Sequence, residues 1–235
     1  MIMGMPISID IPDITDEHIF EQLFDRFKHI DQQFSPYIES SEVSLFAKGN
    51  LHEADLSAQM KATIEACAHY EKLTDGYFSA YYNGSFDPSG YIKAWAIQEA
   101  STTLISQGLT TFLINIAGDM VANGQTKTWR IAIQDPFNKQ TTLGVVALTN
   151  QAIATSGSYV RGAHIFDPHT KSSKTDLISA SIYGPDIIKA DVFATTCTAM
   201  GFDKAVSYMQ GYPEYAALLV KTDGTLLPVN HFAFS

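Results

Sequence analysis

Helical and strand-like patterns are segregated along this sequence, and this order restricts the possible folds more than any other feature. Apolar residues recur at helical spacing in much of the first 106 residues, whereas β-branched and aromatic runs dominate the rest. Because strands and helices do not alternate strictly, we expect an α+β fold with antiparallel sheets. The predicted helices cover 16–34, 56–73, 91–106 and the segment between Pro185 and Gly201, and the predicted strands cover 5–11, 111–116, 129–133, 143–148, 152–155, 178–183, 215–220 and 226–229.

Short polar segments separate these elements. Thr15 or Asp16 is expected to cap the first helix, and residues 35–42 are expected to form a loop. Residues 77–90 are rich in aromatic residues, Ser, Asn and Gly, a composition too irregular for a helix. Asn123-Gly124 predicts a hairpin turn.

The composition excludes several classes of protein. Fifteen Lys and Arg against 25 Asp and Glu give a net charge of −10 without a basic block, which disfavours binding to nucleic acid or to a membrane surface. The two cysteines, Cys67 and Cys197, lie far apart, so a disulfide framework or a cysteine-rich zinc site is excluded. Both lie in apolar helical patterns, and we expect buried, inert thiols.

The sequence carries no pattern of a membrane span or a signal peptide. No apolar run approaches the roughly 18 residues that a spanning helix needs. The N-terminal Met-Ile-Met-Gly-Met-Pro has no basic region followed by an apolar stretch. We therefore expect a cytoplasmic protein, or a periplasmic one only if a leader has been removed.

Two segments have the residue types of a phosphate site and a metal site. Segment 87–93 places Gly90 and Lys93 at a predicted helix N-terminus, whose free N–H groups would attract an anion. Asp191 and Thr195 lie one turn apart on the last long helix, an oxygen pair suited to Mg²⁺. Each segment also has a structural explanation. The first could be an ordinary helix cap with an exposed Asp and Lys, and the second a solvated Asp with a Thr bonded to its own helix.

A third segment gathers His, Asp and hydroxyl groups. His164, Asp167 and His169 follow the hydroxyl-rich run 155–159. An HExxH motif and a Gly-x-Ser-x-Gly elbow are absent, so metalloprotease and triad hydrolase chemistry have no support. A strand ending in an Asp-Pro turn would also explain the segment. A fourth segment, 115–119 (Asn-Ile-Ala-Gly-Asp), is explained by turn chemistry alone.

Taken together and in order, these segments resemble the FAD:protein FMN transferases, the ApbE-like flavin transferases. The similarity covers nearly the whole chain, and the ordered set carries it rather than any single motif. The matched segments are 3–6 for the opening Met-Gly-Thr strand, 34–42 for Phe-Ser-x-Tyr-x-x-x-Ser-Glu, 87–96 for Asp-x-x-Gly-x-x-Lys-Gly-Trp-Ala, 117–119 for Gly-Gly-Asp, 154–157 for Ala-Thr-Ser-Gly, 164–171 for His-Ile-x-Asp-Pro-x-Thr-Gly and 190–195 for Ala-Asp-x-x-Ala-Thr.

Four residues depart from the family pattern. Ala94 and Ala117 each replace a usual Gly, and Lys171 replaces the Gly that ends the Asp-Pro-x-Thr-Gly turn. Ser79 stands where many members have Asp. None of the four removes a metal ligand, but a side chain in place of Gly can crowd the backbone near a ligand.

The resemblance implies a single ApbE-like flavin transferase domain over 1–235. Its fold would be α+β, with two T-fold-like halves, antiparallel sheets and FAD in the cleft between the halves. The resemblance also implies Mg²⁺ held by the side chains of Asp191 and Thr195 and the carbonyl of Gly90. The FAD contacts that it implies are Met3, Tyr37, Tyr77, Phe78, Ser79, Asp87, Lys93 and Ile165.

The implied reaction moves FMN from FAD to a Thr or Ser hydroxyl of another protein through a phosphoester bond and releases AMP. The catalytic residues would be His164, Asp191 and Thr195, with His164 either the base for the acceptor hydroxyl or a group that positions the flavin phosphate. The acceptor would be a subunit of a sodium-pumping or Rnf-type redox complex, or an FMN-binding domain of a fumarate-reductase-like protein. Two alternatives use the same pocket: a Mg²⁺-dependent FAD pyrophosphatase that yields FMN and AMP, and a FAD-binding protein without turnover.

Overall fold

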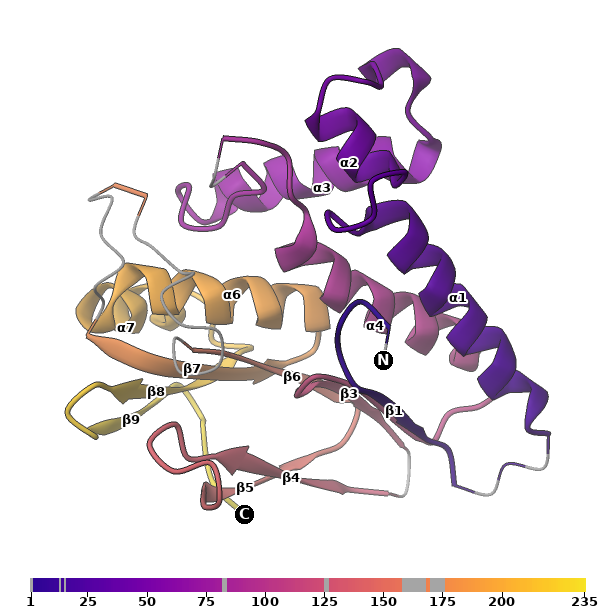
Figure 1. Ribbon diagram of the computed structural model, residues 1–235. Helices are drawn as coiled ribbons and strands as arrows, with labels where there is room; N and C mark the ends of the chain where they lie inside the picture. The colour runs from indigo at the N-terminus through magenta and orange to yellow at the C-terminus, as the bar shows by residue number, and fades with distance from the viewer. Residues whose placement is uncertain are drawn as a thin grey trace.

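A seven-stranded sheet forms the centre of the molecule, with the strand order β1-β2-β3-β6-β7-β8-β9 (Figure 1). All of its pairings are antiparallel, which confirms the predicted α+β class with antiparallel sheets. This computed structural model describes residues 2–12, 14, 16–81, 84–124, 127–157, 168–169 and 176–235. The strands of the sheet are β1 (Ile7–Asp10), β2 (Phe112–Ile116), β3 (Asp119–Asn123), β6 (Gln151–Gly157), β7 (Leu177–Gly184), β8 (Ala216–Lys221) and β9 (Leu226–Val229).

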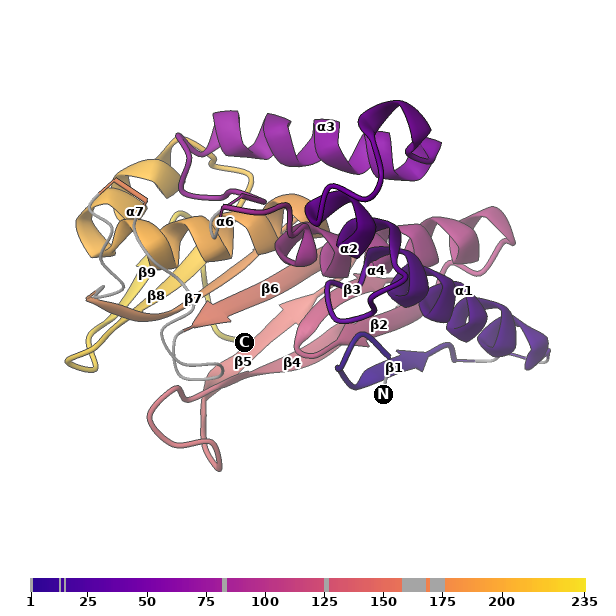
Figure 2. The same ribbon diagram turned by 45° about the horizontal axis from the view of Figure 1, so that its top comes forward.

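Helices cover one face of this sheet in two layers (Figure 1 and Figure 2). In the inner layer, α4 (Ser89–Ser106) and α6 (Ile187–Met200) pack directly on the strands. In the outer layer, α1 (His18–Phe34) packs on α4, and α3 (Ala58–Leu73) lies above α6 in the view of Figure 1. The remaining helical elements are α2 (Glu42–Ala47), which packs on α1, the short 3-10 helix η1 (Glu53–Asp55), and α7 (Phe202–Gln210), which packs on α6 and β8.

A two-stranded hairpin covers the opposite face of the sheet. It consists of β4 (Trp129–Gln134) and β5 (Thr142–Leu148), which pair only with each other among the described strands. The alternating side chains of β4 point their apolar members, such as Trp129 and Ile131, into a second core against the sheet. The middle of the sheet is therefore buried on both faces, which fixes the strands that carry the candidate site.

Helix α6 is buried on almost every side. Its sequence is mostly Ala, Val, Ile, Phe and Thr, and the inner positions Ala190 and Ala194 are fully buried between the sheet and α4. Asp191 lies in the same helix and is only 4% exposed. Because a buried carboxylate costs free energy unless it is paired or holds a cation, this residue needs a specific explanation.

The four predicted helices are confirmed to within two residues at each end, but three short helical elements, α2, η1 and α7, were not expected from the sequence. The six residues of α2 are too few to show a helical period, although Ser41 caps the helix by accepting a hydrogen bond from Ser44 N at 3.0 Å. Helix α7 begins directly after Gly201, where the sequence predicted only the end of α6. At the first helix the N-cap is Glu17 and not the predicted Asp16, whose Oδ1 accepts a hydrogen bond from His18 N at 3.0 Å; Thr15 lies outside the described residues.

The hairpin turn predicted at Asn123-Gly124 is wrong. Strand β3 ends at Asn123 and pairs with β2 and β6, not with β4. The actual two-residue turn is Ala117-Gly118, which joins β2 to β3 with backbone φ angles of 52° and 100°. Two successive positive φ angles are typical of the tight turns that match the twist of paired strands.

Two further expectations concern the cysteines and the membrane. Cys67 and Cys197 are buried and free, as predicted, and burial raises the pKa of both thiols, that of Cys67 to about 12. Within the part of the chain that the structure describes, no helix has the length and the apolar stretch that crossing a membrane requires.

Candidate active site between α4, α6 and β3

Three charged side chains from three different elements meet beneath the N-terminal end of α4. Lys93, in the second turn of α4, forms an ion pair with Asp119 at the start of β3. The same ammonium lies 3.6 Å from Asp191 Oδ1 on α6. The side chain of Lys93 is 20% exposed, whereas those of Asp119 and Asp191 are 1% and 6% exposed. The cluster is therefore almost closed to solvent, and water does little to screen its charges.

The β2–β3 turn places Asp119 in this cluster. Gly118 N donates a hydrogen bond to Asn115 Oδ1 at 2.9 Å, which closes the turn. Thr155 N, on the neighbouring strand β6, donates to Asp119 Oδ1 at 3.2 Å, so the other carboxylate oxygen faces Lys93. Ala117, one of the departures from the family pattern, adopts the left-handed conformation that a Gly would adopt without strain.

The electrostatics of the cluster centre on Asp191. Burial, and next the negative charge of Asp119, raise the pKa of Asp191 from its usual 3.8 to about 7, although Lys93 opposes the shift. Asp191 Oδ2 is buried and has no hydrogen-bond partner among the described residues. An unpartnered carboxylate oxygen in a nearly closed site is the donor that a hard cation such as Mg²⁺ binds.

Thr195 and Gly90 are the other residues expected to hold Mg²⁺. Thr195 lies one turn after Asp191 on α6 and is half-buried, and Gly90 lies in the exposed first turn of α4. A β-carbon on Gly90 would lie 3.3 Å from the ring of Phe78, so the two are packed closely. Groups of three or more His, Cys, Asp or Glu side chains that could hold a metal do not occur in the described ranges. An ion here would depend on hydroxyl, carbonyl and substrate oxygens beside Asp191, which fits Mg²⁺ better than a transition metal.

Tyr77 lies in a separate group of rings and charges near the C-terminal end of α6. The Tyr77 ring is buried against Ala199, and its hydroxyl accepts a hydrogen bond from Lys204 Nζ at 2.7 Å. The imidazole of His169 lies on the Tyr77 ring, with the centroids 4.7 Å apart. Lys204 had no motif around it, and only the three-dimensional structure brings it to Tyr77.

Asp87 and Ser79 have local structural roles in this structure. Asp87 Oδ1 accepts hydrogen bonds from Ser89 N at 3.0 Å and Ser89 Oγ at 2.5 Å, so the carboxylate fixes the start of α4. Ser79 Oγ accepts a hydrogen bond from Tyr81 N at 3.0 Å. The helix-cap explanation of segment 87–93 is wrong for Lys93, which points into the buried cluster, and the N-cap of α4 is Pro88, one residue after Asp87.

Met3 and Tyr37 are near α1, in the outer layer. Met3 N donates a hydrogen bond to Asp31 Oδ2 at 3.1 Å, which ties the N-terminal segment to α1. Tyr37, in the loop between α1 and α2, is 92% exposed and free to contact a ligand. His164, Ile165 and Lys171 lie outside the described residues, so their predicted roles stay predictions.

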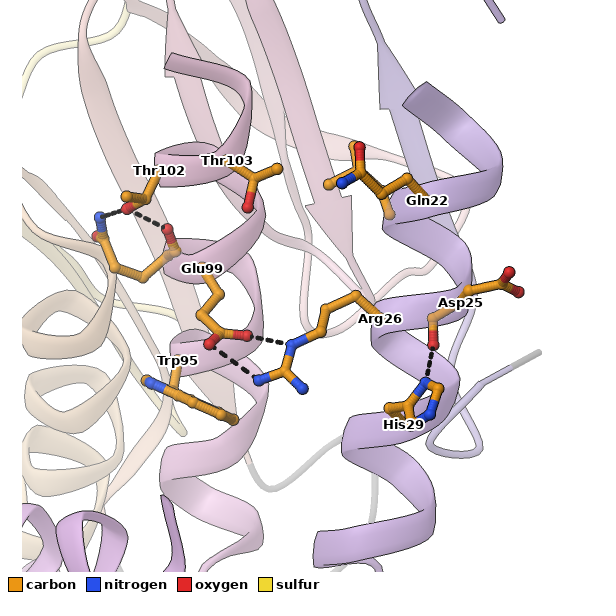
Figure 3. Close-up of a pocket in the computed structure, with 10 residues that line it drawn as sticks. Gln22, Asp25, Arg26, His29, Trp95, Glu99, Thr102 and Thr103 are labelled. Atoms are coloured by element: carbon orange, nitrogen blue, oxygen red, sulfur yellow. Dashed lines mark hydrogen bonds and ion pairs between the residues drawn. The ribbon is translucent and has the colours of Figure 1, made fainter. Parts of the chain in front are cut away.

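A groove of about 720 Å³ lies elsewhere, between α1 and α4 (Figure 3). Arg26 and Glu99 cross it with two hydrogen bonds of 2.8 Å and 2.9 Å, beside Trp95. None of the predicted site residues lines this groove. Its central charges neutralise each other, so we interpret it as the seam between two helices and not as the active site.

The complete fold matches solved flavin transferases. The flavin transferase ApbE from Vibrio cholerae superimposes with a TM-score of 0.84 at 20% identity, covering 99% of this chain and 96% of that one. The ApbE protein from Thermotoga maritima gives a TM-score of 0.84 at 21% identity, covering 97% of this chain and 95% of that one. These similarities define the class of fold.

The sequence identifies the family. The model of the ApbE family matches residues 3–85 and 83–219, so the chain belongs to the ApbE family. A FAD:protein FMN transferase of Vibrio cholerae is 28% identical over 150 residues, which are 58% of this chain and 45% of that protein. The corresponding protein of Treponema pallidum is 28% identical over 158 residues, which are 58% of this chain and 44% of that protein. The matched region thus spans less than half the length of these curated relatives.

Proposed function

We propose that this chain is a FAD:protein FMN transferase. The observation that carries the proposal is the buried cluster of Lys93, Asp119 and Asp191, with an unpartnered oxygen on Asp191. All three of these residues occupy positions of the family motifs. The names of the relatives from Vibrio cholerae and Treponema pallidum support the same activity.

The proposed reaction exchanges one phosphate ester for another. The hydroxyl oxygen of an acceptor Thr or Ser attacks the FMN phosphorus of FAD, and a new P–O bond forms. The P–O bond to the bridging oxygen breaks, and AMP leaves with that oxygen. AMP is a good leaving group because the second pKa of a phosphate monoester is about 6, so it needs no strong general acid.

The acceptor hydroxyl must lose its proton, and this step needs more help from the protein than the departure of AMP. His164 is the proposed base that takes it, because an imidazole titrates near neutral pH. Lys93 supplies a positive charge near the phosphates on a chain whose net charge is −10. The Gly90 carbonyl, Asp191 and Thr195 would hold Mg²⁺, which when bound offsets phosphate charge in the ground and transition states.

The proposal extends to the ligand and the acceptor. FAD should bind more tightly than FMN, because Met3 and Tyr37 match the family positions on the adenosine side, and Tyr37 is exposed. Equal affinity for FAD and FMN in separate titrations would contradict an adenosine pocket. The acceptor would be a redox-complex subunit or an FMN-binding domain, and the site of action would be cytoplasmic.

One assay separates the possible activities. The protein is incubated with FAD, Mg²⁺ and a recombinant FMN-binding domain of a fumarate-reductase-like protein, and AMP is quantified by chromatography. Intact mass spectrometry of the acceptor should show the addition of FMN less one water. AMP release without this mass gain would indicate a FAD pyrophosphatase, and FAD binding without AMP release would indicate a binding protein. Either result would refute the transferase proposal for this acceptor class.

A further inference from the structure

Lys93 forms ion pairs with two buried carboxylates, and it lies nearer to Asp119 than to Asp191. Its ammonium is in direct contact with Asp119 but 3.6 Å from the nearer oxygen of Asp191. Asp191 therefore keeps one oxygen only loosely associated with Lys93 and the other without a hydrogen-bond partner among the described residues. The closer contact of Lys93 with Asp119 leaves Asp191 with a longer ion pair at Oδ1 and an unpartnered Oδ2.

The backbone of the sheet holds Asp119 in place. Thr155 N binds Asp119 Oδ1, and Asp119 itself is the first residue of β3, paired with Ile116 across the turn. Strand β3 lies in the interior of the sheet between β2 and β6. Because the sheet fixes the position of the Asp119 carboxylate, the long Lys93 side chain is the one that extends to form the contact.

We propose that Asp119 is a positioning residue that holds the Lys93 ammonium closer to itself than to Asp191 and so keeps Asp191 Oδ2 available to a divalent cation. This inference rests on the proposed function, because the cation is the Mg²⁺ of that site. It also explains why an aspartate, and not a neutral turn residue, stands at the start of β3. Asp119 would touch neither the cation nor FAD and would act through Lys93.

The charge balance of the cluster gives the expected direction. Above pH 7, where both carboxylates are ionised, two carboxylates and one ammonium leave one net negative charge, which favours binding of a cation. If Asp119 became neutral, Asp191 would be the remaining anionic partner in the cluster, and Lys93 would move toward it. The loss of negative charge and the competition from Lys93 would both weaken cation binding.

The test uses Mn²⁺ as a probe, because it shares the oxygen preference of Mg²⁺ and its free form is measured by electron paramagnetic resonance. Asp119→Asn keeps the oxygen that accepts from Thr155 N but removes the charge. We expect its Mn²⁺ dissociation constant to be at least about tenfold higher than that of the wild type, without FAD. The Lys93→Met exchange in the Asp119→Asn background should restore the affinity to within about threefold of the wild type.

Three results would overturn the inference. These are an unchanged Mn²⁺ affinity in Asp119→Asn, a loss that Lys93→Met does not reverse, and a wild type that does not bind Mn²⁺. Thermal denaturation of each variant shows whether it is folded, and reversal in the double variant cannot come from unfolding. The transfer assay tests the proposed function separately. If the wild type transfers FMN but Asp119→Asn binds Mn²⁺ as tightly as the wild type, this inference alone is refuted. A confirmed Asp119 effect without FMN transfer refutes the proposed function alone.

Discussion

The substitution Asp191→Asn removes a buried negative charge, and we expect it to stabilise the protein in the absence of divalent cations. Burial and the charge of Asp119 raise the pKa of Asp191 from 3.8 to about 7, so the ionised carboxylate is unfavourable in the folded state. Each pH unit of that difference corresponds to about 1.4 kcal/mol, so the ionised form costs up to about 4 kcal/mol of folding free energy.

The net gain in folding free energy from Asp191→Asn is smaller than the cost of the ionised carboxylate. The amide of Asn has two N–H donors, and a buried donor without a partner costs about 1–3 kcal/mol. The free energy of unfolding should therefore rise by roughly 1–3 kcal/mol at pH 8. For a chain of this size, about 1 kcal/mol shifts the melting temperature by about 2–4 °C, so a rise of several degrees is expected. Lys93 keeps its contact with Asp119 and is not left unpaired.

The pH dependence of this stability difference shows whether the ionised Asp191 carboxylate causes it. Above pH 7 the carboxylate is ionised in both the folded and the unfolded state, and the full cost is present. Between pH 7 and about 4 the folded protein holds a proton that the unfolded chain has released, so the stability of the wild type rises as the pH falls. The advantage of Asp191→Asn should thus be largest above pH 7 and should disappear toward pH 4.

The assay is thermal denaturation in EDTA at pH 8 and at pH 5, with the exposed Asp55→Asn as the matched control. Added Mg²⁺ should stabilise the wild type but not Asp191→Asn, because a cation that binds the folded state raises its stability. The reasoning is refuted if Asp191→Asn is less stable than the wild type at pH 8 in EDTA. It is also refuted if the difference between the two proteins is the same at both pH values.

Three further substitutions test other parts of the structure. His164→Ala should slow transfer about 10²–10⁴-fold at saturating FAD with little change in FAD affinity, and a loss of affinity alone would make His164 a binding residue. Gly184→Ala would place a β-carbon 2.2 Å from the buried ring of Tyr215 and should cost about 1–3 kcal/mol in chemical denaturation; an unchanged midpoint would contradict this packing. Glu42→Gln should cost about 1–2 kcal/mol, because Glu42 accepts hydrogen bonds from Ser57 N and Ser57 Oγ at the start of α3, and no loss would show that these bonds are not needed.

Local sequence signals predict the long elements well. Helix α6 is delimited by Pro185 and Gly201, and its boundaries follow from the preference of Pro for helix starts and Gly for helix ends. Strands such as β7 follow from a continuous run of β-branched and small residues. These signals depend only on neighbouring residues, so a single sequence is enough to find them.

Contacts between distant residues explain what sequence reasoning misses. Strand β3 begins directly after a two-residue turn, and its partner β6 lies nearly 30 residues further along the chain. The dipeptide at 123–124 has the composition of a hairpin turn but connects strands that do not pair. Similarly, Asp119 has the sequence context of a turn residue, and its ion pair with Lys93 exists only because α4 packs on β3.

For the predicted site residues as well, local spacing supplies some properties and contacts between distant residues supply the others. Asp191 and Thr195 can be placed on one helix face from their spacing alone, and Lys93 follows from its position in a helix start. Burial of Asp191 and its unpartnered oxygen depend on the packing of α6 between α4 and the sheet. The spacing therefore finds the residues, and the packing determines their charge state.

The parts of the proposed cation site differ in how readily their backbones exchange amide hydrogen with solvent. Asp191 lies in the second turn of α6, enclosed by α4 and the sheet, where opening requires much of the core to separate. Gly90 lies in the exposed first turn of α4, where the hydrogen bonds can open locally. A cation and FAD that join the two should slow exchange at residues 89–92 and leave the already protected α6 unchanged. The start of α4 is thus the natural reporter of ligand binding in this fold.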